Sequence, residues 1–255
     1  MRAALSQPTA RFGLAILVAA IAAAVGVVLA TASNDKTPVA GVSAPNPSSL
    51  PLAPLSSLGK LTPAPKPGAL GPERVPIPIA TKVLANPQNV HLHERIDGIT
   101  CERLENVSYH VHAPLTLFAD GKAYVVPYGI GIGQKWEGVN TAVGPFVEAG
   151  SCFMWLHTHA YDGIIHIESP TAKIYTLGQF FAVWGQPLST TRLGPFRGKV
   201  TTFYDGKVWT GNPNDIPLTS DTQIQLDVGT PIIAPEHIVL PAALLPSTSI
   251  APTTT

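Results

Sequence analysis

The segment Cys152–Glu168, with the sequence C-F-M-W-L-H-T-H-A-Y-D-G-I-I-H-I-E, has the pattern of a β-hairpin. Two arms rich in apolar residues flank the dipeptide Asp162-Gly163. Asp-Gly is a strong signal for a two-residue type I′ turn, because both central positions of that turn need a positive φ. We therefore predict two antiparallel strands joined at Asp162-Gly163.

The predicted turn fixes which side chains share a face of the hairpin. With a two-residue loop, His159 pairs with His166 and His157 pairs with Glu168. Directly paired residues lie on one face, as do residues two positions apart on a strand. One face therefore gathers three imidazoles and a carboxylate. The other face has a core composition: Cys152, Met154, Leu156, Ile165 and Ile167.

Histidines also recur in pairs elsewhere. The sequence contains 8 histidines, and six of them form the His-x-His pairs His91/His93, His110/His112 and His157/His159. On a strand this spacing directs two imidazoles to one side, which suits a Zn²⁺, Cu²⁺ or Fe²⁺ ion. We predict a transition-metal site built on His157, His159 and His166, with His110 and His112 contributed by a neighbouring strand.

Glu168 lies on the same predicted face and has three chemically reasonable roles. It can bind the metal, orient an imidazole, or act as a general acid or base. A bland alternative stays open, in which the histidines form local hydrogen bonds on half-buried strands and Glu168 is a surface carboxylate. His91 and His93 lie beside charged residues, so we expect them to be exposed.

The N-terminal region has the pattern of a membrane anchor. Residues 1–11 carry two arginines and no acidic residue, and residues 12–31 are almost entirely apolar. Such a stretch is long enough to cross a bilayer core of about 30 Å as a helix. The positive-inside rule then predicts a cytoplasmic lead, a transmembrane helix at 12–31 and an extracytoplasmic remainder. A cleaved signal is the alternative, with Ala30-Thr31-Ala32 as its cleavage site.

The remaining chain divides by composition. Residues 32–81 are rich in proline and serine and are predicted to be a semi-extended linker, residues 82–240 to be the folded domain, and residues 241–255 to be a disordered tail. Cys101 and Cys152 both fall in the domain. In an exported protein such a pair typically forms one disulfide, with a cysteine metal site as the alternative.

Alternating patterns and turn dipeptides define the predicted fold. A capping box at Thr176–Gln179, an apolar stripe and then Gly185 predict one helix. We expect a mainly β domain, an antiparallel sandwich or barrel of hairpins with one short helix, after the transmembrane helix. The predicted strands are 90–93, 107–118 joined by Asp120-Gly121 to 123–126, 200–204 joined by Asp205-Gly206 to 207–210, and 223–228.

Three blocks resemble a family of exported or membrane-anchored microbial proteins without an assigned activity: Y-H-V-H-A-P-L-T-L-F-A-D-G-K, W-L-H-T-H-A-Y-D-G-I-I-H-I-E-S-P and Y-T-L-G-Q-F-F-A-V-W-G-Q-P-L. The resemblance implies the domain limits and the histidine motif, and no reaction. Such sequences often have Asp after His-Thr-His, where this chain has Ala160. The motif is also similar in ligand set to the cupins, small β-barrels that bind metals through three His and one Glu, although Glu168 here comes nine positions after His159.

Charge excludes one class of function. Lys+Arg and Asp+Glu are both 16, so the chain lacks the basic excess of a nucleic-acid-binding protein. We expect a membrane-anchored, extracytoplasmic domain that binds Zn, Cu or Fe, with the membrane as partner of the N-terminal helix. The alternatives are a metalloenzyme with Glu168 as acid or base, and a cell-envelope interaction module in which the histidines are structural.

Overall fold

The computed structural model describes residues 45–80, 82–89 and 92–246, so the predicted lead and membrane anchor lie outside the described residues. No helix of the described part is long and apolar enough to cross a bilayer. The fold is mainly β, as predicted, and α1 (Leu177–Trp184) is the one α-helix of the described part.

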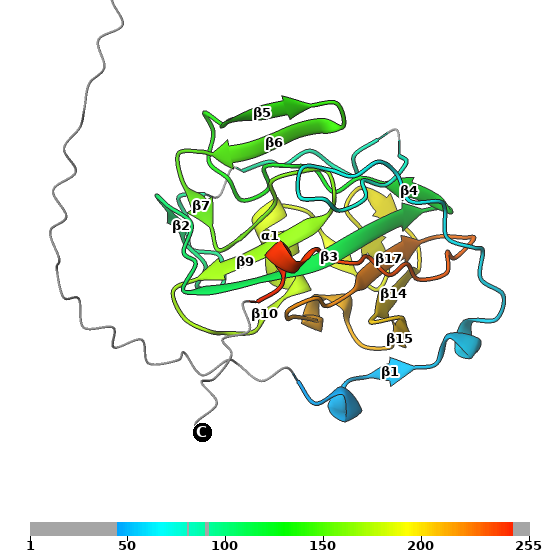
Figure 1. The fold of residues 1–255 in the computed structure, drawn as a ribbon. Helices are drawn as coiled ribbons and strands as arrows, with labels where there is room; N and C mark the ends of the chain where they lie inside the picture. The colour runs from blue at the N-terminus through cyan, green and yellow to red at the C-terminus, as the bar shows by residue number, and fades with distance from the viewer. Residues whose placement is uncertain (1–44, 81, 90–91, 247–255) are drawn as a thin grey trace, which may run out of the picture. The chain divides into compact units, whose positions relative to one another are not determined.

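An 8-stranded sheet organises the fold (Figure 1). The order is β1 (Leu52–Ala53), β15 (Lys207–Trp209), β14 (Val200–Tyr204), β17 (Ile224–Val228), β3 (Tyr109–Ala119), β9 (Ile164–Ser169) and β8 (Leu156–His157), with β4 (Lys122–Tyr124) paired to β3. The expectation of a wholly antiparallel fold is wrong at one pairing, because β17 and β3 are parallel. The two strands are joined by a long crossover that contains α1, and such a connection permits parallel pairing where a tight hairpin does not.

Shorter elements surround this sheet. Pairs form between β2 (Cys101–Glu102) and β7 (Phe153–Met154), β5 (Glu137–Thr141) and β6 (Gly144–Ala149), and β10 (Tyr175–Thr176) and β16 (Pro217–Leu218). A three-stranded sheet contains β11 (Leu188–Ser189), β12 (Arg192–Leu193) and β13 (Phe196–Arg197). Short 3₁₀ turns occur at η1 (Pro47–Ser49), η2 (Leu55–Leu58), η3 (Pro213–Asp215) and η4 (Ala242–Leu244).

Two of the predicted hairpins are confirmed. Asp120 and Gly121 join β3 to β4 with φ of 47° and 71°, and Asp205 and Gly206 join β14 to β15 with φ of 47° and 72°. Two successive positive φ values are what a type I′ turn requires. The strand predicted at 90–93 is wrong where it is described, because residues 92–93 form a turn.

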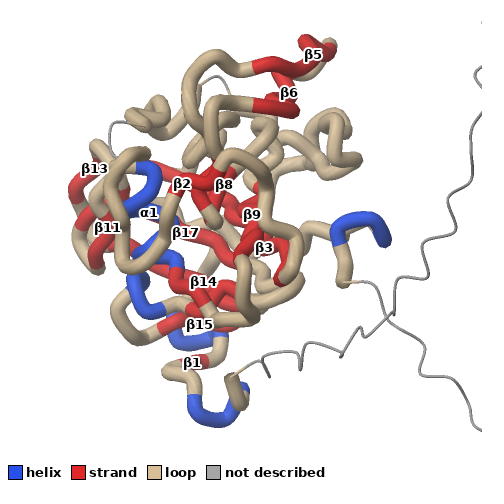
Figure 2. The backbone as a smooth tube through the Cα atoms, turned by 90° about the vertical axis from the view of Figure 1, so that its left-hand side faces the viewer, coloured by secondary structure: helices blue, strands red, loops and turns tan. Residues whose placement is uncertain are grey.

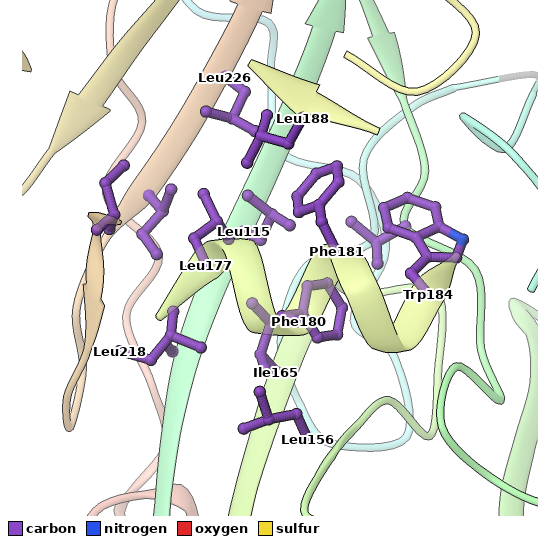
Figure 3. Packing of buried hydrophobic residues seen from close by; sticks show 14 of the residues in the cluster. Leu115, Leu156, Ile165, Leu177, Phe180, Phe181, Trp184, Leu188, Leu218 and Leu226 are labelled. Carbon is purple, nitrogen blue, oxygen red and sulfur yellow. The ribbon is translucent and has the colours of Figure 1, made fainter. Parts of the chain in front are cut away.

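One face of the sheet forms the hydrophobic core. Strands alternate their side chains with a period of two, so Leu115 of β3, Ile165 of β9 and Leu226 of β17 point to the same side. The helix α1 packs there through Phe180 and Trp184 (Figure 3). Thr176 and Gln179 form the predicted capping box, and Gly185 ends the helix with φ of 74°. The helix therefore supports β3 and β9 on the apolar face of the sheet.

The opposite face of the sheet is polar, and coil segments cover it. Val75 from the predicted linker and Leu244 from the predicted tail pack together on Ile164 of β9. The linker and tail assignments are therefore wrong for residues 50–80 and 241–244, and β1 even pairs with β15. The physical reason is that the scattered apolar residues of these two segments pack on the sheet, and without them this face of the sheet would be open to solvent. Figure 2 shows loops surrounding β3, β9 and β8.

Candidate metal centre

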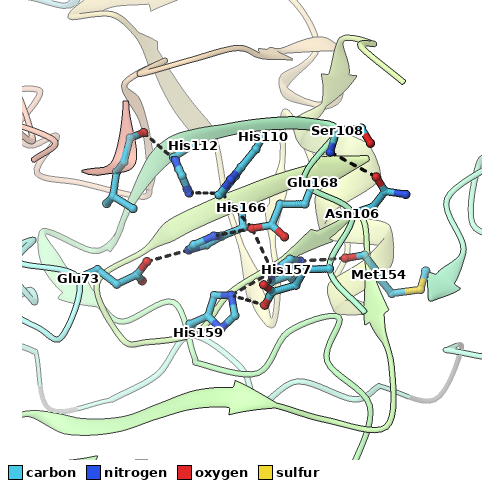
Figure 4. Close-up of polar contacts among 12 residues, drawn as sticks. Glu73, Asn106, Ser108, His110, His112, Met154, His157, His159, His166 and Glu168 are labelled. Atoms are coloured by element: carbon cyan, nitrogen blue, oxygen red, sulfur yellow. Dashed lines mark hydrogen bonds and ion pairs between the residues drawn. The ribbon is translucent and has the colours of Figure 1, made fainter. Parts of the chain in front are cut away.

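Three neighbouring strands bring the histidines together on the polar face. His112 of β3 pairs directly with His166 of β9, and His166 pairs with His157 of β8. In the next row His110 of β3 pairs with Glu168 of β9. Because paired residues share a face, the contribution predicted from a neighbouring strand arises from ordinary sheet register (Figure 4).

The predicted register of the central hairpin is wrong by two residues. His157, and not His159, pairs with His166. Thr158 does not continue the pairing with β9, because it bonds to another loop instead. Its N–H donates to the carbonyl of Ile130, and its hydroxyl donates to the carbonyl of Pro127. A shift of two keeps every side chain on its face, so the histidines still converge.

The turn itself explains the shift. Gly163 has φ of 78°, but Asp162 is not among the residues with positive φ, so the pair does not form a type I′ turn. Asp162 is buried, and its Oδ1 accepts the N–H of Ile164. The carbonyl of Gly163 accepts the N–H of Leu115. The hairpin therefore has a longer loop, and the loop packs against β3.

Backbone carbonyls fix the orientation of three imidazoles. The Nδ1 of His112 lies 2.7 Å from the carbonyl oxygen of Leu244. Likewise, His157 Nδ1 is 2.9 Å from the carbonyl oxygen of Met154, and His159 Nδ1 is 2.5 Å from that of Val147. A carbonyl only accepts, so each Nδ1 carries the proton and each neutral ring presents a lone pair at Nε2. This is the arrangement by which proteins orient histidine ligands of metals.

The two lone pairs of the central His-x-His point at each other. His157 Nε2 and His159 Nε2 lie 3.0 Å apart. Burial, together with neighbouring imidazoles, lowers the pKa of His157 well below its usual range and that of His159 to about 4. Both rings are therefore neutral near pH 7, and no proton lies between the two Nε2 atoms. A cation bound to both lone pairs removes this repulsion.

His166 is the centre of the cluster. Its Nε2 lies 2.8 Å from Glu73 Oε1, and its Nδ1 lies 3.3 Å from Glu168 Oε1. Burial lowers the pKa of His166, but the two carboxylates outweigh burial and raise it to about 10. The metal-free ring is therefore protonated on both nitrogens, and it becomes a metal ligand only by releasing one of these protons. Burial raises the pKa of Glu168, but hydrogen bonds from His110 and His166 outweigh burial and lower it well below its usual range. Glu168 is therefore ionised. An ionised carboxylate suits the role of ligand better than the role of acid.

Two acidic residues of the site were not predicted from the sequence. Glu73 lies in the region predicted to be a linker. Its one distinguishing feature there is that acidic residues are rare among the prolines. Glu105 has its Oε1 3.4 Å from His159 Nε2, and burial raises the pKa of its carboxyl. No periodic pattern surrounds either residue, so only the tertiary structure brings them to the histidines.

The predicted disulfide is present and anchors the segment that carries Glu105. Cys101 and Cys152 are bonded, which joins β2 to the start of β7. In the same segment Glu102 Oε1 accepts the indole N–H of Trp155 at 2.8 Å. These contacts hold the 101–105 segment beside β8, because β8 follows β7 after a single residue.

All six predicted site residues therefore meet, and they form two overlapping groups. His157, His159, His166 and Glu168 are buried, and their ligand atoms lie within 4.8 Å of one another. The same spacing holds for His110, His112, His166 and Glu168, of which His110 is exposed. His93 and His237 are exposed, and His91 lies outside the described residues. Comparisons with protein-family models, with curated proteins and with solved structures returned no match.

Proposed function

We propose that this chain is a membrane-anchored, extracytoplasmic protein whose β domain binds a transition-metal ion through His157, His159 and His166, with Glu168 as a carboxylate ligand. The observation that carries the proposal is the 3.0 Å separation of two Nε2 atoms whose rings are both held on backbone carbonyls. Hydrogen bonding alone leaves these two acceptors facing each other, whereas metal binding uses both.

The donor set narrows the choice of ion. Imidazole nitrogens suit Zn²⁺, Cu²⁺ and Fe²⁺, and a single carboxylate completes a four-ligand set. Both cysteines are in the disulfide, so the site has no thiolate. Zinc or copper in the divalent state fits these ligands better than a soft monovalent ion. The apolar segment 12–31, preceded by arginines, supports the proposed anchoring.

Metal analysis of the purified full chain tests the proposal. The wild-type protein is expected to retain a transition metal through dialysis, and His157→Ala/His159→Ala is expected to lose the ion at the buried group. His93→Ala/His237→Ala is the matched control, because both of those side chains are exposed and neither belongs to the His/Glu groups. Circular dichroism of every variant separates loss of metal from loss of fold. A wild-type protein that stays folded and binds neither zinc nor copper contradicts the proposal.

A second function, a metalloenzyme with Glu168 as acid or base, is weaker. Glu168 is 2% exposed and is ionised, so it is poorly placed to exchange protons with a substrate. Glu168→Gln distinguishes the two roles: a ligand variant loses metal, whereas an acid–base variant keeps metal and loses turnover. The interaction-module alternative predicts a domain whose unfolding temperature is unchanged by a chelator.

A further inference from the structure

We propose that the centre binds two transition-metal ions, an inner ion at His157 and His159 and an outer ion at His110 and His112, with the Glu168 carboxylate between them. This inference rests on the proposed function and extends it from one ion to two. It changes the chemistry available at the site, because two ions that share a ligand can act on one bound molecule together.

The outer pair has the same Nε2–Nε2 separation as the inner pair, but a backbone carbonyl holds only its His112 ring. His110 Nε2 and His112 Nε2 lie 3.0 Å apart, as do the Nε2 atoms of the inner pair. His112 is oriented by the carbonyl of Leu244, so its Nε2 presents a lone pair toward His110. Burial, with His166 and His110 next in importance, lowers the pKa of His112 to about 3, which keeps that ring neutral.

One ion cannot use all the ligands that converge here. Zinc and copper sites in proteins take about four ligands, whereas this cluster offers five imidazoles and a carboxylate. The two groups share only His166 and Glu168. His166 lies between the pairs, with its ring centroid 4.5 Å from that of His112 and 4.4 Å from that of His159. The cluster therefore divides naturally into two sets around a shared centre.

Glu168 has the contacts expected of a shared ligand. Its Oε1 lies 3.0 Å from His110 Nε2 and 3.9 Å from His157 Nε2, so it reaches both pairs. Its Oε2 is buried and has no hydrogen-bond partner among the described residues. A buried carboxylate oxygen without a partner is unfavourable, and coordination of a second cation by this oxygen supplies the missing interaction.

The two positions differ in access to solvent. The His110 side chain is 38% exposed, whereas His157 is fully buried. We therefore expect the outer ion to exchange with solution faster than the inner ion. The outer position is also the one at which a small anionic or water ligand can reach a bound ion without opening the fold.

Zinc stoichiometry of the full-length protein tests the second ion. Metal-free protein titrated with Zn²⁺ is expected to bind two equivalents, and His110→Ala/His112→Ala is expected to bind one. The control His93→Ala/His237→Ala is expected to keep two. A wild-type stoichiometry of one, unchanged in His110→Ala/His112→Ala, overturns the second ion but leaves the proposed function intact. A wild-type stoichiometry of zero overturns both.

A second measurement covers a double variant that fails to fold. His110→Gln alters only the exposed ring, and it is expected to weaken the second zinc equivalent at least tenfold while leaving the first unchanged. With Cu²⁺ as the probe, two neighbouring ions are expected to give a dipolar-broadened electron paramagnetic resonance spectrum in the wild type and an isolated-ion spectrum in His110→Gln. An isolated-ion spectrum in the fully loaded wild type contradicts the proposal.

Discussion

Glu73 and His166 are joined by a 2.8 Å contact between Oε1 and Nε2, although they are 93 positions apart in the chain. The Glu73 side chain is 6% exposed. Burial raises the pKa of its carboxyl, but the neighbouring His166 outweighs burial and lowers it. The contact occupies Nε2 of His166 and leaves Nδ1 directed at Glu168. Glu73 is thus the residue that orients the central imidazole.

Replacing Glu73 with Gln is expected to weaken metal binding about 10- to 100-fold, because carboxylates that orient histidine ligands contribute on that scale. Competition with a chromophoric chelator measures the change. Glu137→Gln, on the exposed part of β5, is the control and is expected to bind as the wild type does. Equal affinities of the two variants contradict an orienting role for Glu73.

Gly163→Ala is expected to destabilise the domain by about 2–4 kcal/mol. The residue has φ of 78°, and a Cβ there collides with the carbonyl oxygen of Leu115. Gly206→Ala is the matched control, because it has φ of 72° but open space around its Cβ position, so that only about 1 kcal/mol of backbone strain is expected. Urea unfolding of the metal-free proteins measures both. Equal losses mean that the close approach to β3 contributes nothing.

Removal of the disulfide by Cys101→Ser/Cys152→Ser is expected to lower stability by about 2–4 kcal/mol. The bond closes a loop with a sequence separation of 51, for which chain entropy alone predicts about 4 kcal/mol. The variant also frees the segment that carries Glu105, so zinc is expected to dissociate faster. Guanidinium unfolding and stopped-flow chelation give the two quantities, and a loss of stability below about 1 kcal/mol contradicts the prediction.

Asp227 is expected to make stability fall as the pH rises toward and through neutrality. Burial, despite hydrogen bonds from Ile233 and Gln225, raises the pKa of its carboxyl to about 7. The folded state therefore holds a proton between about pH 4 and pH 7 that the unfolded state has released. The stabilisation is complete below pH 4 and is lost as the pH rises through 7.

Thermal unfolding of Asp227→Asn from pH 4 to pH 8 checks this dependence. Asn carries no titrating proton, so the difference between wild type and variant is expected to shrink by on the order of 2–4 kcal/mol across that range. Asp215→Asn, an exposed residue of η3, is the control and is expected to follow the wild type. A pH-independent difference between wild type and Asp227→Asn contradicts the prediction, because it means that folding does not raise the pKa of Asp227.

The sequence predicted the clustering of the histidines because sheet periodicity needs only local information. A period of two places His157 and His159 on one side, and a register error of two residues leaves that side unchanged. The Asp-Gly dipeptide was decisive for the hairpins at Asp120 and Asp205, where nothing competes with the turn. At Asp162 the contacts with β3 and with the 127–130 loop override the local preference.

The covering segments were beyond prediction for a different reason. Proline-rich chain carries no periodic signal, and its position is decided by what it covers. Gln223 and Gln225 of the β17 region bond through their side chains to the backbone at 236–238, which ties the C-terminal segment to the polar face. Such side-chain pairing leaves no pattern in the covering segment itself. Leu244 follows this tied segment, whereas Glu73 is held at the site by its own contact with His166.

The carbonyl that orients His112 belongs to Leu244, 132 positions later in the chain. During synthesis, therefore, the pair His110/His112 appears long before the residue that fixes the His112 ring. A nascent chain that has not reached Leu244 holds the histidines but lacks the carbonyl that orients His112. If the cluster binds metal as proposed, a chain that stops before Leu244 carries all five imidazoles of the cluster without the orientation of His112.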